Sequence, residues 1–414
     1  MRASVTPPAD EPRRDGWRAA AQVFVVALGL GVTSFGGPVA HLAYFERTYV
    51  RRLSWLSAED YAGIVGLCQT LPGPASSQVG FLVGLRRAGP AGALAAWLGF
   101  TLPSAALMFA FALAAPRLTG PWSRAALHGL QLTAAAVVAQ AVWSMARRLC
   151  PDLPRAALGV TGGIVALAIA GPFAQLAALA AGAVGGILLL RRLTHTAETV
   201  KSAASPRAGL AAVSFVAILL LASFWPGADR SRTPVALAAL VYRAGALVFG
   251  GGHVVLPLLQ GALVPSGWLD QSRFLAGYGA AQAVPGPLFT FAAYIGAAAA
   301  PAGSSIVLRA AWSALALVAI FLPGLLLALG ALPLWSWLSR HAAARAALMG
   351  INAAVVGVLA AALWRPVLTT AITAPIDIAI AAVAFLLLFR LPPLAIVALC
   401  VVCALVELAP FCKL

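Results

Sequence analysis

Charged residues are scarce in this chain of 414 residues. Asp, Glu, Lys and Arg make up only 10% of it, whereas soluble globular proteins carry about 25%. Apolar residues reach 62%, and the mean hydropathy is +0.93, which excludes a disordered chain as well. The longest polar stretches, 1–16 and 191–208, are too short to bury a hydrophobic core. We therefore expect a membrane protein without a separate soluble domain.

The groups that catalysis or metal binding would need are also missing. The five cysteines do not form a metal-binding set, and Cys400 and Cys403 stand in an apolar segment with no nearby His or acid. Small buried side chains are the simpler interpretation of such cysteines. No nucleophile–base pair and no phosphate-binding loop is visible either. The sequence therefore predicts no enzyme, no metal site and no cofactor.

The charges that are present are unequal, because 28 Lys plus Arg face 12 Asp plus Glu, a net charge of +16. Such an excess is typical either of a nucleic-acid-binding domain or of the loops of a membrane protein. The positions of the arginines favour the membrane protein, since they stand in small groups, such as Arg147–Arg148, between long apolar runs. These runs can cross about 30 Å of hydrocarbon, which takes roughly 20 helical residues. We predict a polytopic protein in a lipid bilayer, with no nucleic-acid partner.

The sequence also repeats itself, since six landmarks recur in the same order in its second half. They are Phe35-Gly-Gly and Phe249-Gly-Gly, Trp55-Leu and Trp268-Leu, Gln69-Thr-Leu-Pro-Gly-Pro74 and Gln282-Ala-Val-Pro-Gly-Pro287, Phe100-Thr-Leu-Pro103 and Ile320-Phe-Leu-Pro323, Arg124-Ala-Ala-Leu and Arg345-Ala-Ala-Leu, and Trp143 and Trp364. We predict four parts from this order: a disordered cytoplasmic tail (1–16), a first repeat (17–192), a linker with one transmembrane helix (193–231) and a second repeat (232–411).

Gly-Gly or Pro-Gly-Pro interrupts two apolar segments in each repeat. Because Pro removes a backbone donor and Gly accepts positive φ, each interruption must end one helix and begin another. Either a broken spanning helix or a re-entrant hairpin would result, and the hairpin places 19 of the 28 basic residues, including those of 147–155, on one face, as expected of the cytoplasmic side. Four crossings per repeat and one in the linker then make an odd number, which inverts the second repeat. The predicted fold is an all-α polytopic membrane protein of two inverted-topology homologous repeats with broken or re-entrant helices, joined by a linker transmembrane helix.

Three motifs are specific enough to carry a family resemblance: Ser34-Phe-Gly-Gly-Pro-Val-Ala-His41, Gln69-Thr-Leu-Pro-Gly-Pro-Ala-Ser-Ser-Gln78 and Phe249-Gly-Gly-Gly-His253. They resemble the chromate transporter (CHR) family in its long two-domain form, over residues 17–411. The resemblance implies a protein of the bacterial cytoplasmic (inner) membrane that exports chromate by using the proton-motive force, with protons as the coupling ion, and so confers chromate resistance. Chromate is a tetrahedral dianion similar to sulfate, and sulfate competes with it in the family. An importer of sulfate or another inorganic anion is the alternative function, and both a monomer and a homodimer stay open.

A dianion inside a membrane needs hydrogen-bond donors, but a carrier must also release it, so partial charges suit this task better than many full charges. Half-helices that begin after the interruptions present unpaired N–H groups and the positive end of the helix dipole. We therefore expect four such ends to converge on one oxyanion, assisted by nearby polar side chains. The predicted substrate-binding residues are Gly36, Gly37, His41, Gln69, Pro72, Gly73, Pro74, Ser76, Ser77, Gln78, Gly250, Gly251, His253, Gln282, Pro285, Gly286, Pro287 and Thr290. The predicted entrance residues, which would concentrate anions, are Arg47, Arg86 and Arg87.

Each of these residues also has an interpretation that involves no substrate. The Gly pairs allow close helix packing, and the Pro-Gly-Pro turns can be purely architectural. Gln69 and Gln282 can bond the carbonyls that the interruptions leave free. His41 and His253 either carry a coupling proton or only hydrogen-bond within their helices. The arginines satisfy the charge bias of cytoplasmic loops without any transport role.

Overall fold

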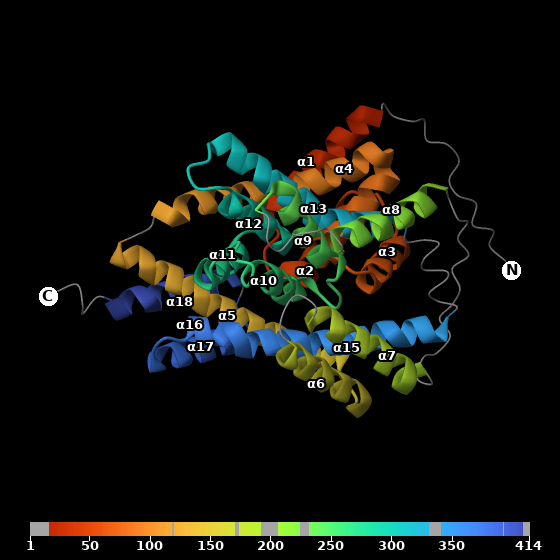
Figure 1. Cartoon of the computed structure of the whole chain (residues 1–414). Coiled ribbons are helices and arrows are strands. Elements are labelled where there is room, and N and C mark those ends of the chain that lie inside the picture. The colour runs from red at the N-terminus through yellow and green to blue at the C-terminus, as the bar shows by residue number, and fades with distance from the viewer. Residues whose placement is uncertain are drawn as a thin grey trace.

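A computed structural model of the chain describes residues 16–117, 120–169, 174–191, 206–223, 232–330, 341–391 and 393–408. Their regular secondary structure is helical throughout, and these residues contain no strand (Figure 1). The all-helical class is therefore confirmed. Residues 1–15 of the predicted tail, and the linker residues on either side of 206–223, lie outside the described residues.

The helices follow one another in nearly the same order in the two halves. The first half contains α1 (Gly16–Thr33), α2 (Gly37–Phe45), α3 (Ala58–Thr70), α4 (Ala75–Ala114), α5 (Pro121–Leu149), α6 (Leu153–Ala168) and α7 (Ala174–Leu190), and α8 (Pro206–Ser223) lies in the linker. The second half contains α9 (Pro234–Ala246), α10 (Val255–Leu263), α11 (Gln271–Ala283), α12 (Phe291–Ala299), α13 (Ile306–Leu329), α15 (Ala342–Ala362), α16 (Thr369–Ala371), α17 (Pro375–Leu387) and α18 (Pro393–Leu408). Short π-helical or 3-10 segments adjoin these helices: η1 (Glu46–Arg52), η2 (Ala115–Arg117), η4 (Gly252–Val254), η5 (Leu288–Thr290) and η6 (Leu363–Leu368).

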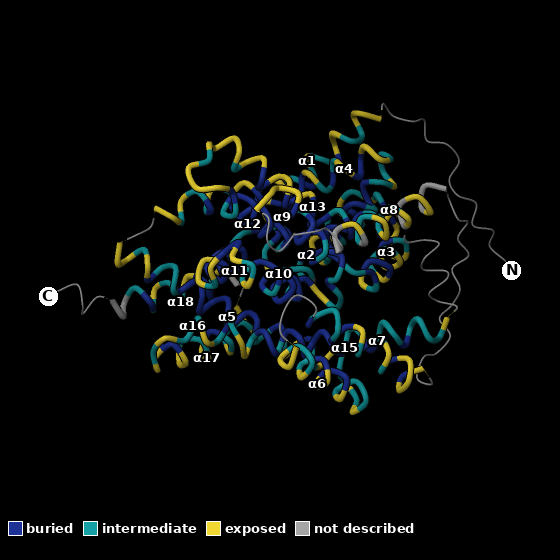
Figure 2. Tube along the Cα trace, viewed as in Figure 1, coloured by how far each residue is buried: buried dark blue, intermediate teal, exposed yellow. Residues whose placement is uncertain are grey.

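The surface of the molecule is unusually apolar. Five helical stretches of the described chain are long and apolar enough to cross a membrane. Large apolar side chains are exposed on the outer helices, among them Leu153 (82% exposed) and Leu188 (76% exposed). Figure 2 shows buried residues gathered in the centre and exposed residues along α6, α7 and α17. A surface of this kind suits hydrocarbon rather than water.

Side chains fix the start of the third helix at the same place in each half. Ser57 precedes α3, and its hydroxyl accepts a hydrogen bond from the backbone N–H of Asp60 at 3.0 Å. Asp270 precedes α11, and its carboxylate accepts from the backbone N–H of Arg273 at 2.8 Å. Both residues are N-caps, which satisfy one of the donors that a helix start leaves unpaired. Ser57 and Asp270 are also repeat counterparts, since they precede the two Gln-X-X-Pro-Gly-Pro motifs by the same number of residues.

Glycine lets the same pair of helices approach closely in each half. A Cβ on Gly31 of α1 would lie 2.7 Å from the Phe100 carbonyl oxygen of α4. A Cβ on Gly245 of α9 would meet the Ile320 carbonyl of α13 in the same way. Phe100 and Ile320 are repeat landmarks, so the equivalent helices of the two halves pack against each other in the same way.

α4 changes direction within its length. Ala88 and Gly89 have non-helical backbone angles, and Gly89 has a φ of 64°. The two arms of α4 fold back on each other at this point, because a Cβ on Gly84 would overlap the backbone of Gly92. The short α12 and the long α13 make the equivalent hairpin in the second half, with Gly296 against the Trp312 backbone.

The two halves interlock. α6 and α7 of the first half pack on α15 of the second half, and α17 and α18 of the second half pack on α5 of the first. In Figure 1 the short helices α2 and α10 lie between an upper group (α1, α4 and α13) and a lower group (α5, α15, α6 and α7). The interrupted segments are therefore enclosed by long helices from both halves.

Candidate functional site

Each interruption contains glycine in a conformation that other residues rarely adopt. α1 ends at Thr33 and α2 begins at Gly37, and the φ angles are 96° at Gly36 and 76° at Gly37. α3 ends at Thr70 and α4 begins at Ala75, with a φ of 114° at Gly73. Gly250, Gly251 and Gly286 also have positive φ in the second half. The chain leaves one helix and starts another at each of these places because Gly tolerates such angles.

The interruptions of the two halves bond to each other in a reciprocal pattern. The backbone N–H of Gly73 donates to the Val248 carbonyl at 2.8 Å, and that of Gly286 donates to the Ser34 carbonyl at 2.9 Å. Gly73 and Gly286 are the central residues of the two Pro-Gly-Pro turns, and Ser34 and Val248 each precede Phe-Gly-Gly. Each Pro-Gly-Pro turn is therefore tied to the Gly-Gly interruption of the other half.

A second pair of contacts repeats this pattern. A Cβ on Gly73 would lie 3.0 Å from Gly324 Cα, and a Cβ on Gly286 would lie 2.8 Å from Ser104 Oγ. Ser104 and Gly324 each follow the internal proline of a repeat landmark. Reciprocal contacts of this kind are what a two-fold relation between equivalent elements produces. The two halves therefore build their centre jointly.

A cavity of about 370 Å³ lies at this centre, and we call it the central cavity. The start of α2, the start of α4 and the segments that lead into α10 and α12 all contribute to its wall, together with one face of α5. The described residues that line it include no Asp or Glu. They are Gly36, Pro38, His41, Leu42, Cys68, Gln69, Leu71, Gly73, Pro74, Ala75, Ser76, Gln140, Ser144, Met145, Arg148, Leu149, Gly250, Gly251, Gly252, His253, Pro287, Leu288 and Phe289. The starts of α2 and α4, and of the 3-10 segments that lead into α10 and α12, thus border one space, and the N-terminal end of a helix carries a partial positive charge.

The structure brings many of the predicted substrate-binding residues to this wall. The first half contributes Gly36, His41, Gln69, Gly73, Pro74 and Ser76, and the second half contributes Gly250, Gly251, His253 and Pro287. The remaining predicted residues lie outside the lining: Gly37, Pro72, Ser77, Gln78, Gln282, Pro285, Gly286 and Thr290. No ligand contact tests either group, so their role in binding stays a prediction.

Two residues outside the lining have structural partners. The Gln78 amide donates to the Pro72 carbonyl at 2.9 Å and to the Gly324 carbonyl at 3.0 Å. It thereby bonds a carbonyl that the interruption leaves free and joins the two halves. The Thr290 hydroxyl donates to the Pro287 carbonyl at 2.8 Å. Both side chains hold the Pro-Gly-Pro turns in place.

The two histidines are placed differently. His41 of α2 is 1% exposed, and its Nδ1 lies 3.3 Å from Ser76 Oγ of α4. The Nε2 of His41 has no side-chain partner among the described residues. His253 is half-buried, and its Nδ1 lies 2.9 Å from the Tyr278 hydroxyl. Each imidazole therefore has a hydroxyl beside its Nδ1 and also borders the central cavity.

A polar stripe on α5 completes the wall, and the sequence analysis missed it. Gln140, Ser144 and Arg148 line the central cavity. They stand four residues apart, which places them on one face of a helix. Ser144 and Arg148 are exposed, so this side of the cavity is open. The spacing of four in an apolar helix is the sequence signal for this stripe. The pair Arg147–Arg148, taken alone, indicates only the end of a membrane-spanning segment.

The predicted entrance residues do not line the central cavity. Arg86 forms an ion pair with Asp60, with 3.1 Å between Nη1 and Oδ1. The Arg87 guanidinium lies over the Trp55 ring, 5.4 Å from its centroid. Arg47 is exposed. The first two are therefore held by neighbours outside the cavity wall, and their effect on anion entry is not tested.

Comparison with known proteins agrees with this architecture. A family model described as chromate transporter matches residues 21–190 and again residues 235–406. The chain belongs to the chromate transporter family. Each half of the chain thus carries one copy of the family's domain, and the apolar helices with this membership make it a multi-pass membrane protein.

Three similar family members come from different bacteria. A chromate transport protein of Pseudomonas aeruginosa is 29% identical over 277 residues, which cover 66% of this chain and 65% of that protein. A probable chromate transport protein of Synechococcus elongatus is 25% identical, covering 81% of each chain. A chromate transport protein of Cupriavidus metallidurans is 26% identical, covering 82% of this chain and 81% of that one. The match to the Pseudomonas protein thus spans slightly less than two thirds of its length. No solved structure matches the chain.

Proposed function

We propose that this protein exports chromate, or a related tetrahedral oxyanion, from the bacterial cytoplasm at the expense of the proton-motive force. The central cavity carries the proposal, because four helical starts and Arg148 border it while no described acidic side chain lines it. Backbone N–H groups and helix dipoles attract an anion without the tight hold of many full charges. A carrier needs this balance between binding and release. Membership of the chromate transporter family gives the substrate class.

Protons are the proposed coupling ion. His41 and His253 are the titratable imidazoles that border the central cavity, and histidine gains and loses a proton near physiological pH. A proton on either ring adds a positive charge beside the anion, so proton and anion occupancy become linked.

The proposed architecture is a pair of inverted repeats with re-entrant interrupted segments. The reciprocal bonds of Gly73 and Gly286 support a two-fold relation between the halves, and the odd number of crossings expected from the sequence supports inversion. Arg148 is exposed at the open side of the central cavity, and Arg147–Arg155 belong to the face predicted to be cytoplasmic. We therefore assign this conformation to the state that receives anion from the cytoplasm.

Everted membrane vesicles test the function directly. We expect vesicles that contain the protein to accumulate chromate when a proton gradient is applied and to stop when an uncoupler is added. Arg148→Gln should raise the KM for chromate by about tenfold or more, because hydrogen bonds to charged groups contribute about 1.5–3 kcal/mol.

Arg147→Gln is the matched control. It removes the same charge from the last turn of the same helix, but Arg147 lies over the Trp143 ring at 5.9 Å and outside the cavity lining, so its KM should change less than twofold. Equal effects of the two variants would contradict the role of the central cavity. Transport of sulfate alone, into right-side-out vesicles, would favour the importer instead.

A further inference from the structure

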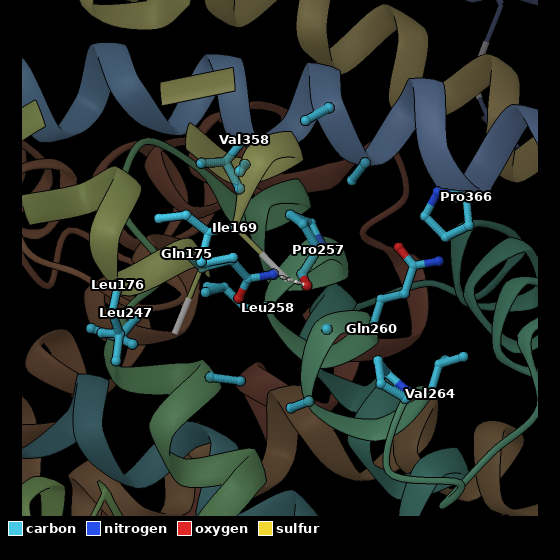
Figure 3. A pocket seen from close by; sticks show the side chains of 18 of the residues that line it. Ile169, Gln175, Leu176, Leu247, Pro257, Leu258, Gln260, Val264, Val358 and Pro366 are labelled. Atoms are coloured by element: carbon cyan, nitrogen blue, oxygen red, sulfur yellow. Dashed lines mark hydrogen bonds between the residues drawn. The ribbon is translucent and has the colours of Figure 1, made fainter. Parts of the chain in front are cut away.

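A second cavity, of about 250 Å³, lies beside α10 and apart from the central cavity. The ends of α6 and α7, the helices α9 and α10, the start of α11 and the junction of α15 with η6 surround it (Figure 3). The central cavity borders the segment that leads into α10, and the second cavity borders α10 itself: His253, just before this helix, lines the central cavity, and Gln260 within it lines the second one. Seven residues separate them, roughly 10 Å along a helix.

The polar part of this second cavity consists of donors. Two arginines and three glutamines contribute, and the described residues that line it include no Asp or Glu. The five polar residues are Gln175, Arg243, Gln260, Gln271 and Arg365. Arg365 forms no ion pair with any described acidic side chain. An arginine guanidinium stays protonated, so the cavity is positively charged.

One of these glutamines is buried with an unused donor. Gln260 is 4% exposed, and its Nε2 has no hydrogen-bond partner among the described residues. Figure 3 shows its amide directed from α10 toward Pro366. Gln175 behaves differently, because its amide donates to the Pro257 carbonyl and packs against Gly261, where a Cβ would be 2.8 Å from Nε2. Buried donors are nearly always satisfied in proteins. We therefore expect a hydrogen-bond acceptor for the Gln260 amide inside the second cavity.

The internal repeat gives this region a counterpart. Trp143 of α5 pairs with Trp364, and the same register aligns Gln140 with Ala361 and Ser144 with Arg365. The α15–η6 junction thus occupies, in the second half, the place of the polar stripe of α5 that lines the central cavity. The wall of the second cavity is therefore related by the repeat to the wall of the central one.

We propose that the second cavity is a further binding site for a tetrahedral inorganic oxyanion, with the Gln260 amide and the Arg365 guanidinium as its main ligands. It is a separate station for the anion, beside α10, whereas the central cavity lies at the segment that leads into this helix. The inference rests on the proposed function, because it assumes that the chain handles oxyanions.

Sulfate binding to the full chain in lipid nanodiscs tests this inference, with radiolabelled sulfate as the probe because chromate oxidises thiols and Cys68 lines the central cavity. We expect two sulfates per wild-type chain. Gln260→Leu should bind one, and Arg365→Gln should weaken the second site about tenfold or more. Gln22→Leu and Arg390→Gln remove the same groups at exposed positions outside both cavities, so both should keep two sulfates.

The outcomes separate the two proposals. A single sulfate that is lost in Arg148→Gln and kept in Gln260→Leu would overturn the second site and leave the proposed function intact. A phospholipid that copurifies with the wild type but not with Gln260→Leu, without a second sulfate, would overturn it as well. Unchanged sulfate binding in Arg148→Gln and Gln260→Leu, together with no chromate uptake by everted vesicles, would refute the proposed function itself.

Discussion

Gly73 joins the two halves of this transporter at their centre, by a backbone hydrogen bond to Val248 and by close packing on Gly324, so Gly73→Ala tests the interlocked centre. Its φ is 114°, and a Cβ would lie 3.0 Å from Gly324 Cα. A side chain in left-handed backbone costs about 1–2 kcal/mol, and overpacking a close contact costs about 1–3 kcal/mol. Because the clash involves backbone that cannot rotate away, we expect a total loss of about 2–5 kcal/mol.

Gly303→Ala is the control for backbone strain alone. Gly303 has a φ of 77°, but a Cβ there would meet no atom within 4 Å. Thermal unfolding of purified protein should therefore give Gly73→Ala a Tm several degrees below that of Gly303→Ala. Chromate uptake should fall in Gly73→Ala and stay near wild type in Gly303→Ala. Equal Tm values for the two variants would refute the argument that the contact with the second half matters.

The opposite contact supplies a rescue experiment. Gly286→Ala should also destabilise the protein, but a Cβ there would approach Ser104 Oγ at 2.8 Å, a hydroxyl that can shift. Ser104 is the repeat counterpart of Gly324, so Ser104→Gly copies the arrangement of the other half. Adding Ser104→Gly to Gly286→Ala should recover about the 1–3 kcal/mol of overpacking and leave the backbone strain. No recovery would mean that Ser104 is not the source of the clash.

Three other changes have predictable effects. His128→Met removes the Nε2 that lies 2.9 Å from Oδ1 of the fully buried Asp377, so the Tm should fall by the equivalent of about 1–3 kcal/mol, and a Tm equal to wild type would contradict this. Gly350→Ala places a Cβ against the backbone of α7 and should lower the free energy of unfolding by about 1–3 kcal/mol. In its control, Gly29→Ala, the Cβ meets no atom within 4 Å, so the same assay should show no loss of stability. Arg86→Gln breaks an exposed ion pair worth less than about 1 kcal/mol, so the KM for chromate should rise less in this variant than in Arg148→Gln. An equal rise in the two variants would establish Arg86 as an entrance residue.

The interruptions could be located from sequence because they depend on local backbone chemistry. Gly36, Gly73 and Gly286 have the positive φ that their neighbouring prolines and glycines predict. The partners of these residues could not be located in this way. Gly73 bonds to the Val248 carbonyl, and a backbone carbonyl leaves no mark in a side-chain pattern.

A simpler explanation also covers the arginine that lines the central cavity. Arg148 stands beside Arg147, and the charge bias of cytoplasmic loops accounts for both. The difference between them arises from helix geometry, because Arg148 continues the face of Gln140 and Ser144 while Arg147 turns toward Trp143. The second cavity was hidden for a different reason. Its wall combines α6 and α7 of one half with α10 and α15 of the other, and only tertiary packing brings these elements together.

The two halves share their backbone but differ in the side chains along the proposed path. The repeat aligns Gln140 with Ala361 and Ser144 with Arg365, while Glu46 aligns with Gln260. The shared backbone supplies helix ends, which attract any anion equally from either half. A carrier with identical halves would therefore hold its anion with equal affinity at equivalent places. The unequal side chains place Arg365 in the second cavity where the central one has Ser144, whereas Arg148 of the central cavity stands one helical turn beyond Ser144, so the two proposed stations carry their positive charge at different places. Duplication thus explains the geometry of the path, and divergence between the repeats is what can give the two stations different tasks.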